Sequence, residues 1–300
     1  MKVWLVGKDG QLGQSLIAYF KQNSSLLNAR FKIQSTNKSD VDICNSASVS
    51  RYMAMFKPDI IVNAAAYTNV EQAETDIELC REVNLLGTNN LAKAASHYKI
   101  PLIHLSTDYV FDGQSVSPYL ETDDTQPLNS YGETKLQSEA LIRAELKQHL
   151  IIRTSWLISQ YGNNFAKTVL RLSKQHSQLA MISDQQGCPT FADDLSAAVF
   201  KLLMAIDSGQ ADWGTFHYCG SRAMTWFELT QQILDEALKH KKINSKPEVV
   251  AISSEAFALQ ANTKALRPKY SVLGCQKIKQ VWGITRPDWT CSLKRLVDKL

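Results

Sequence analysis

The chain has 300 residues, of which 44% are hydrophobic and 21% charged, so its composition is that of an ordinary globular protein and excludes a disordered or fibrous one. This length accommodates one full domain and a smaller second lobe. The formal net charge is only +4 and the basic residues are scattered, which gives no stripe for nucleic acid but leaves a mild positive field that suits an anionic ligand.

The N-terminus and the cysteines predict a cytoplasmic location. The apolar run at residues 3–6 is broken by Gly7, and nowhere does the chain reach the ~18 apolar residues that a membrane span needs. The six cysteines lie far apart without a C-x-x-C pair, so we expect reduced thiols rather than a zinc site or a disulfide framework.

Short apolar segments alternate with amphipathic stretches through the first half of the chain, which is typical of βαβ units. The runs at 60–62 and 102–105 are almost wholly apolar, as expected for strands of a parallel sheet covered on both faces. The remaining expected strands are 3–6, 31–33 and 150–152, with helices at 11–22 and 84–98.

After Trp156 this rhythm loosens, with helices expected at 165–175 and 195–206. The predicted fold class is therefore α/β, a Rossmann-type doubly wound parallel sheet with a smaller C-terminal substrate-binding lobe. We place the dinucleotide-binding domain at 1–155 and the substrate-binding lobe at 156–300, with an approximate boundary and with segments free to exchange between the two.

A glycine pattern follows the first expected strand and opens the first expected helix: Gly7, Gly10, Gln11, Leu12 and Gly13. Glycines here allow a tight turn, so the free N–H groups at the helix N-terminus can receive a pyrophosphate. A flexible strand–helix turn is the plainer alternative.

Tyr131 and Lys135 stand four residues apart at the start of an expected helix, so they share one face. There the ammonium of Lys135 can stabilise a tyrosinate and lower the pKa of the phenol from ~10 toward neutrality, so that the phenol can exchange a proton with a carbonyl oxygen. An ordinary helix start with two exposed side chains is the alternative.

The segment 106–113 follows the expected strand 102–105, at the sheet edge where ligands of open α/β sheets bind. Thr107 in this segment can hydrogen-bond a substrate carbonyl from the side opposite Tyr131. Turn formation is the common role of such Ser/Thr clusters.

These patterns together resemble the extended short-chain dehydrogenase/reductase superfamily and, within it, the dTDP-4-dehydrorhamnose reductase family. The resemblance spans nearly the whole chain. Its motifs are G-x-x-G-Q-L-G at 7–13, V-N-A-A-A-Y-T at 62–68, S-T-D-Y-V-F-D-G at 106–113, Y-G-E-T-K at 131–135, R-T-S-W at 153–156, G-N-N-F at 162–165 and the pair at 267–268.

By this resemblance, Thr107, Tyr131 and Lys135 form the catalytic triad, with Tyr131 as the proton donor. Thr107, Asp108 and Trp156 are expected to contact the sugar. The residues expected to contact the cofactor are Gly7, Gly10, Gln11, Leu12, Gly13, Asp42, Ile43, Ala65, Ala66, Thr68, Tyr131 and Lys135. Plainer alternatives are a solvated loop acid for Asp42, close packing for the two alanines and a core anchor for Trp156.

Two further polar residues have structural alternatives. Asn84 is expected to begin the helix 84–98 and, by the resemblance, to support the Lys135 side of a proton relay; helix capping is the competing explanation. The histidines, including His104 inside an expected strand, lack ligand spacing and are interpreted as structural.

The resemblance implies NADPH- or NADH-dependent reduction of the 4-keto group of dTDP-4-dehydro-L-rhamnose to dTDP-L-rhamnose, a precursor of cell-surface polysaccharide such as lipopolysaccharide O-antigen. The alternatives are reduction of another nucleotide 4-ketosugar, dehydration or epimerisation, and a non-catalytic dinucleotide-binding subunit. Related dehydratases carry an acid pair after the threonine, whereas Asp108 is followed here by Tyr109. Non-catalytic relatives tend to lose triad residues, all of which are present.

NAD-selective sites place an acid after the second strand to hold the ribose 2′-hydroxyl. No acid precedes Asp40 here and Lys38 offers a counter-charge, so we expect NADPH to be accepted at least as well as NADH.

Some relatives form homodimers bridged by Mg²⁺ through an acid in the first helix. Because Ser15 stands at that position, we predict no metal-ligand set, and a magnesium-bridged homodimer stays open.

Overall fold

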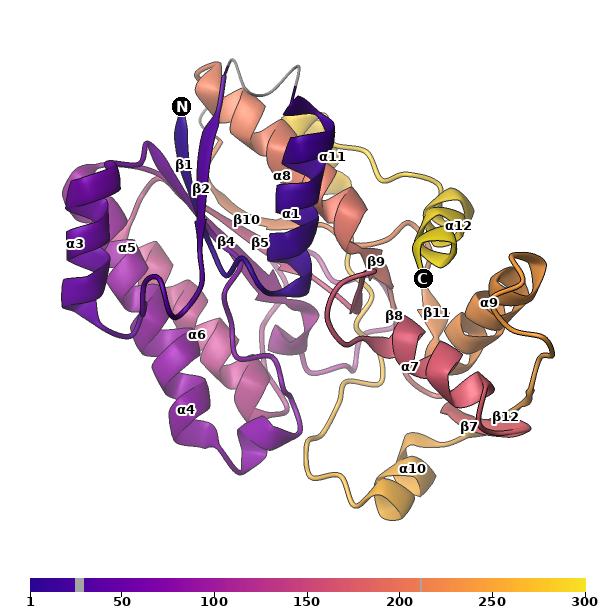
Figure 1. The fold of residues 1–300 in the computed structure, drawn as a ribbon. Coiled ribbons are helices and arrows are strands. Elements are labelled where there is room, and N and C mark those ends of the chain that lie inside the picture. The colour runs from indigo at the N-terminus through magenta and orange to yellow at the C-terminus, as the bar shows by residue number, and fades with distance from the viewer. Residues whose placement is uncertain (25–29, 211) are drawn as a thin grey trace.

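The computed structural model describes residues 1–24, 30–210 and 212–300 (Figure 1). In this part of the chain, six parallel strands form one sheet in the order β10-β5-β4-β3-β1-β2, which confirms the predicted α/β class. The strands are β1 (Lys2–Val6), β2 (Lys32–Thr36), β3 (Ile60–Asn63), β4 (Leu102–Thr107), β5 (His149–Thr154) and β10 (Gly214–His217).

Alternate residues of the inner strands β1 and β3 are buried on opposite faces of the sheet. Val3 and Leu5 belong to one hydrophobic cluster, and Trp4 and Val6 belong to another. The first face is covered by α1 (Gln11–Gln22), α8 (Ala192–Asp207) and α11 (Gln276–Trp282), and the second by α3 (Ser46–Phe56), α5 (Thr88–Tyr98) and α6 (Ser130–Glu145) (Figure 1). This three-layer arrangement explains the wholly apolar strand sequences.

One predicted helix boundary is wrong. The helix does not begin at Asn84, because α4 (Ile77–Arg81) runs through a π-helical segment, η2 (Glu82–Gly87), directly into α5. The buried Asn84 side chain lies inside this segment, where it accepts from the Tyr67 N–H at 2.8 Å and donates to Thr134 Oγ1 at 3.1 Å. It therefore ties the loop after β3 to α6 and does not cap a helix.

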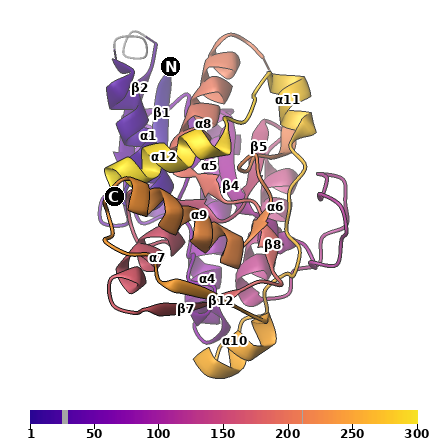
Figure 2. The same cartoon turned by 90° about the vertical axis from the view of Figure 1, so that its right-hand side faces the viewer.

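The C-terminal lobe lies beside the sheet in Figure 1 and in front of it in the turned view of Figure 2, and it has its own hydrophobic cluster. Its elements are β6 (Leu157–Ile158), α7 (Phe165–Ser173), β7 (Gln178–Ile182), β8 (Gln186–Gly187), β9 (Thr190–Phe191), β11 (Met224–Thr225), α9 (Trp226–Lys239), β12 (Glu248–Ile252), α10 (Ser254–Ala261) and α12 (Trp289–Lys299). The described residues also form three 3₁₀- or π-helical pieces: η1 (Gln72–Glu74), η2 and η3 (Asp108–Val110).

The two halves of the sequence share the central sheet. β10 pairs with β5, and α8 packs on α1, although both elements follow residue 155. The boundary at 155 stays a prediction. None of the helices in the described ranges is long and apolar enough to cross a membrane.

Candidate active site

Two adjoining cavities lie at the carboxyl edge of the sheet. The larger is about 600 Å³ and the smaller about 290 Å³, and they share Asp9, Gly10, Ala64 and Ala66 as lining residues. The loops that follow β1, β3, β4 and β5 all reach the larger cavity. Parallel strands bring these loops together at one edge, as the sequence predicted.

Nearly all of the predicted site residues line these cavities. Gly7, Asp42, Ile43 and Ala65 line the smaller cavity; Gly10 and Ala66 line both; Gln11, Leu12, Thr68, Thr107, Asp108, Tyr131, Lys135 and Trp156 line the larger. Gly13 is the exception. A Cβ on Gly13 would lie 2.1 Å from the Gly7 carbonyl oxygen, so this glycine lets α1 pack on the loop.

The glycine loop presents the start of α1 to both cavities. Gly7 has a φ of +91°, and a Cβ there would lie 2.6 Å from the Ala65 nitrogen, so only glycine fits between the loops after β1 and β3. Gly10 is the N-cap of α1 and no side chain caps this end. The first N–H groups of the helix, with the positive end of its dipole, are thus available to an anion.

Tyr131 is fixed by the contacts of its neighbours in the first turn of α6. The Asn129 side chain accepts from the Gly132 N–H at 2.8 Å, and Glu74 accepts from the Ser130 N–H at 2.7 Å. A Cβ on Gly132 would lie 2.2 Å from the Tyr109 carbonyl oxygen, so glycine allows α6 to start against η3. Burial raises the pKa of Tyr131, and a hydrogen bond with the Thr107 hydroxyl opposes that rise, so the lowering toward neutrality expected from Lys135 does not occur in this structure.

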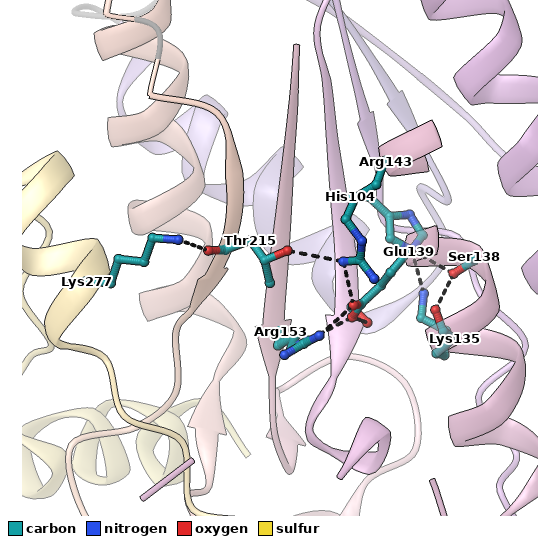
Figure 3. A network of polar contacts seen from close by, with 9 residues as sticks. His104, Lys135, Ser138, Glu139, Arg143, Arg153, Thr215 and Lys277 are labelled. Atoms are coloured by element: carbon teal, nitrogen blue, oxygen red, sulfur yellow. Dashed lines mark hydrogen bonds and ion pairs between the residues drawn. The ribbon is translucent and has the colours of Figure 1, made fainter. Parts of the chain in front are cut away.

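Lys135 lies one helical turn further along α6 and is 1% exposed. Its Nζ donates to the Leu105 carbonyl oxygen at 2.7 Å and lies 2.9 Å from His104 Nε2 (Figure 3). Burial lowers the pKa of Lys135 to about 8, although the Glu139 carboxylate and Cys80 oppose the shift. This amine can therefore exchange a proton near neutral pH.

A buried ion pair supports the floor of the site (Figure 3). Arg153 of β5 donates to both Glu139 oxygens, at 3.0 and 2.7 Å, and the Ser106 hydroxyl donates to Glu139 at 2.6 Å. Burial raises the pKa of Glu139, but the hydrogen bond and charge of Arg153, with smaller contributions from Ser106 and Arg143, together outweigh burial and leave this pKa below its ordinary value. The pair fixes α6 against the ends of β4 and β5.

Thr107 ends β4 and Asp108 begins η3, and both residues line the larger cavity. The Thr107 hydroxyl donates to Asp108 Oδ1 at 3.1 Å and accepts from the Tyr109 N–H at 3.2 Å. Burial raises the pKa of Asp108 to about 7, opposed by the Ser271 and Thr107 hydroxyls. Asp108 is thus a carboxyl group that can hold its proton near neutral pH.

Two tryptophans form one wall of the larger cavity. The rings of Trp156 and Trp226 stack with centroids 3.4 Å apart and an interplanar angle of 3°. A Cβ on Gly187 would lie 2.5 Å from the Trp156 ring, so the indole is held between Gly187 and Trp226. Trp226 Nε1 donates to Gln185 at 3.2 Å.

Sequence reasoning missed Trp226. Thr225 and Glu228 form a capping box, a T-x-x-E pattern that marks a helix start at Trp226. Nothing in that pattern indicates that this helix reaches a site 70 residues earlier in the chain. Arg267, noted only as part of a motif, also lines the larger cavity.

At the far end of the smaller cavity, Asn37 and Lys38 are lining residues, whereas Asp40 is not. Asp40 forms an ion pair with Lys8 and accepts from the Asn37 N–H at 3.0 Å. The bond from Lys8 lowers the pKa of Asp40. The first acid after β2 is therefore engaged within its own loop.

The position considered for a bridging metal is buried. Ser15 is 1% exposed, and its hydroxyl lies 3.4 Å from that of Ser159. Within the described ranges, no group of three or more His, Cys, Asp or Glu side chains is arranged to hold a metal ion. A magnesium-bridged homodimer stays a prediction.

The parallel sheet, the glycine loop at an uncapped helix N-terminus and the Thr–Tyr–Lys set at the same edge define an NAD(P)-dependent oxidoreductase with a Rossmann-like fold. The family model described as the RmlD substrate binding domain matches residues 1–300. The chain belongs to the dTDP-4-dehydrorhamnose reductase (RmlD) family, and its activity is that of a dTDP-4-dehydrorhamnose reductase.

Known relatives match over their full length. The dTDP-4-dehydrorhamnose reductase of Escherichia coli K12 is 37% identical over 100% of this chain and 98% of that protein, and the one of Aggregatibacter actinomycetemcomitans is 36% identical over 98% of each. The crystal structure of the Bacillus anthracis dTDP-4-dehydrorhamnose reductase in complex with NADP is 32% identical, covers 100% of this chain and 99% of that chain, and has a TM-score of 0.88.

Proposed function

We propose that the two cavities together bind NADPH or NADH and dTDP-4-dehydro-L-rhamnose, and that Tyr131 protonates the oxygen at C4 as dTDP-L-rhamnose forms. The observation that carries this assignment is the placement of Thr107, Tyr131 and Lys135 in one cavity, beside the uncapped start of α1. The bound nicotinamide supplies the hydride. The residues of the chain supply binding, orientation and the proton.

The residues present fit such a cofactor. The close approach at Gly7 and the uncapped N–H groups in the first turn of α1 suit a pyrophosphate, and the smaller cavity has the mostly apolar lining that an adenosine group needs. Asp42 and Ile43 would contact the adenine, and Ala65, Ala66 and Thr68 the middle of the cofactor.

The proposed proton transfer uses Tyr131 and Lys135, which lie one turn apart on α6. The Tyr131 phenol gives its proton to the developing alkoxide, and the Lys135 ammonium stabilises the tyrosinate that remains. Thr107 orients the carbonyl, and Asp108 and Trp156 hold the sugar. Tyr109, which follows Asp108, is a half-buried tyrosine whose pKa is raised to about 12 by desolvation, so a carboxylate base for dehydration is missing at this position.

Arg267 supports a nucleotide-linked sugar as the substrate. It lines the larger cavity and also a third cavity of about 220 Å³, which lies between α10 and the segment 263–269. A guanidinium at this junction can pair with a diphosphate through two parallel hydrogen bonds. We therefore assign the third cavity to the nucleoside end of the substrate.

The cofactor choice that we propose is NADPH at least as readily as NADH. Asp40 is paired with Lys8, and this ammonium offsets part of the repulsion between Asp40 and a 2′-phosphate at Asn37 and Lys38.

The test is turnover with dTDP-4-dehydro-L-rhamnose and other nucleotide 4-ketosugars, using each cofactor, with products identified by mass. We expect each reduced product to be heavier than its substrate by two hydrogens, and we expect the rate of reduction to be highest for dTDP-4-dehydro-L-rhamnose. We expect no loss of water from dTDP-glucose. Dehydration of dTDP-glucose, or no reduction of any 4-ketosugar, would refute the assignment.

A further inference from the structure

His104 lies inside β4 with no exposed surface, and both of its ring nitrogens face nitrogen atoms. Nδ1 lies 3.1 Å from Asn63 Nδ2, and Nε2 lies 2.9 Å from Lys135 Nζ (Figure 3). A neutral imidazole has one N–H and one lone pair, so one of these two partners must accept a hydrogen bond. An amide nitrogen cannot accept.

The orientation of the Asn63 amide decides the direction of this chain of hydrogen bonds. Asn63 Oδ1 accepts from the Ala65 backbone N–H at 3.1 Å, and a backbone N–H can only donate. Asn63 must therefore present its NH₂ group to His104, which makes Nδ1 the acceptor. The proton of the neutral ring then sits on Nε2 and points at Lys135.

We propose that His104 is a positioning residue that offers its Nε2–H to the Nζ lone pair of Lys135 and thereby stabilises the neutral amine over the ammonium. The amine keeps its own N–H bond to the Leu105 carbonyl oxygen. An ammonium has no lone pair for His104, so protonation of Lys135 breaks this contact and releases Nζ toward the larger cavity. This inference rests on the proposed role of Lys135 in the reaction.

Burial of the pair favours the neutral amine more strongly than the nearby charges favour the ammonium. Glu139 on α6 and Cys80 on α4 favour the ammonium, yet burial keeps the pKa of Lys135 at about 8. Burial and the nearby Lys135 hold the pKa of His104 well below its ordinary value, so the ring is neutral. The Ser138 hydroxyl lies 3.5 Å from Nε2 and gives its own proton to the Lys135 carbonyl oxygen, which leaves Nζ as the closer acceptor.

The role of this contact is proton supply. After Tyr131 gives its proton to the substrate oxygen, a proton from the Lys135 ammonium restores the phenol. The resulting neutral amine then accepts a hydrogen bond from His104 Nε2–H. The amine then takes a proton from solvent. Side chains from three elements, β3, β4 and α6, thus determine the protonation state of one amine. This series of hydrogen bonds begins at the backbone N–H of Ala65, which lines the smaller cavity.

The first test is the tautomer of His104 in the unaltered protein, measured by long-range ¹H–¹⁵N NMR with labelled histidine. We expect a neutral ring protonated on Nε2, with the signal assigned by its loss in His104→Gln. A ring protonated on Nδ1, or on both nitrogens, would overturn the proposal. This measurement needs neither cofactor nor activity, so it is independent of the assigned reaction.

The second test is the titration of Lys135, followed through ¹³Cε-labelled lysine and assigned with Lys135→Met. The amide oxygen of His104→Gln can accept from an ammonium, so this variant should titrate at least about one pH unit higher than the unaltered protein. Asn63→Asp should act likewise, because its carboxylate accepts from Nδ1–H and reverses the tautomer.

The double variant Asn63→Asp/His104→Gln distinguishes an effect of the His104 tautomer on the Lys135 pKa from a direct effect of the new carboxylate charge. If Asn63→Asp acts through the imidazole, most of its shift disappears in the His104→Gln background, whereas a through-space effect of the new charge persists there. The basic limb of the pH profile of kcat/KM should move with the Lys135 titration. An unchanged Lys135 titration in His104→Gln, with thermal unfolding confirming the fold, would show that His104 only fills space.

Discussion

The two cavities of the site are built in different ways. The smaller one is bounded by residues 6–83, which are consecutive strand–loop units, and its wall combines glycines and alanines with larger side chains such as those of Val41, Ile43 and Lys38. The larger one draws on residues from 9 to 267, including two tryptophans and an arginine. Binding at the smaller cavity therefore depends on neighbouring units within the first 83 residues, whereas binding at the larger cavity depends on side chains from distant parts of the sequence.

The sharpest way to test this division is to remove the one oxygen that gives the proton. Tyr131→Phe should lower kcat by ~10²- to 10⁴-fold, because general acid catalysis is lost, while NADPH affinity stays nearly unchanged. Steady-state rates and fluorescence titration of the cofactor would measure the two effects separately. Near-normal turnover would exclude Tyr131 as the acid. An equal loss in kcat and in NADPH affinity would contradict the separation of the two cavities.

A second test acts on the glycine loop. Gly13→Ala places a Cβ against the Gly7 carbonyl oxygen, and we expect such overpacking to lower the free energy of unfolding by about 1–3 kcal/mol. Gly10→Ala is the matched control, since its Cβ would meet only the Gly7 oxygen at an ordinary 3.5 Å. Denaturant titration of both variants checks this. Equal stability of the two would mean that the loop relaxes around Gly13.

The same division explains how far the sequence alone could lead. The helix 11–22 and the glycine loop were predicted because their signals lie within a few adjacent residues. The start at Asn84 was wrong because a π-helical segment joins two helices without a local break in the pattern. His104 was interpreted as structural, since its contacts with Asn63 and Lys135 exist only once three elements have packed.

The stacked tryptophans provide a smaller, more selective test. Trp226→Ala removes the ring that supports Trp156, so we expect the KM for the sugar to rise by about 2- to 12-fold, equivalent to about 0.5–1.5 kcal/mol for an aromatic pair. Trp226→Phe keeps a ring and should retain most of the affinity. The KM for NADPH serves as the internal reference. A change there as large as for the sugar would show that α9 supports both cavities.

The smallest expected effect concerns Lys38 at the exposed end of the smaller cavity. A solvent-exposed ion pair contributes about 0.2–1 kcal/mol, so Lys38→Ala should lower kcat/KM for NADPH by about fivefold or less and leave NADH unchanged. Because salt screens exposed charges, the difference between the variants should shrink as ionic strength rises. Lys201→Ala, which removes an exposed lysine on α8, controls for net charge. Comparison of kcat/KM for both cofactors at two salt concentrations is sufficient. A strong NADH preference in the unaltered enzyme would mean that Asp40 leaves Lys8 and turns toward the ribose when the cofactor binds.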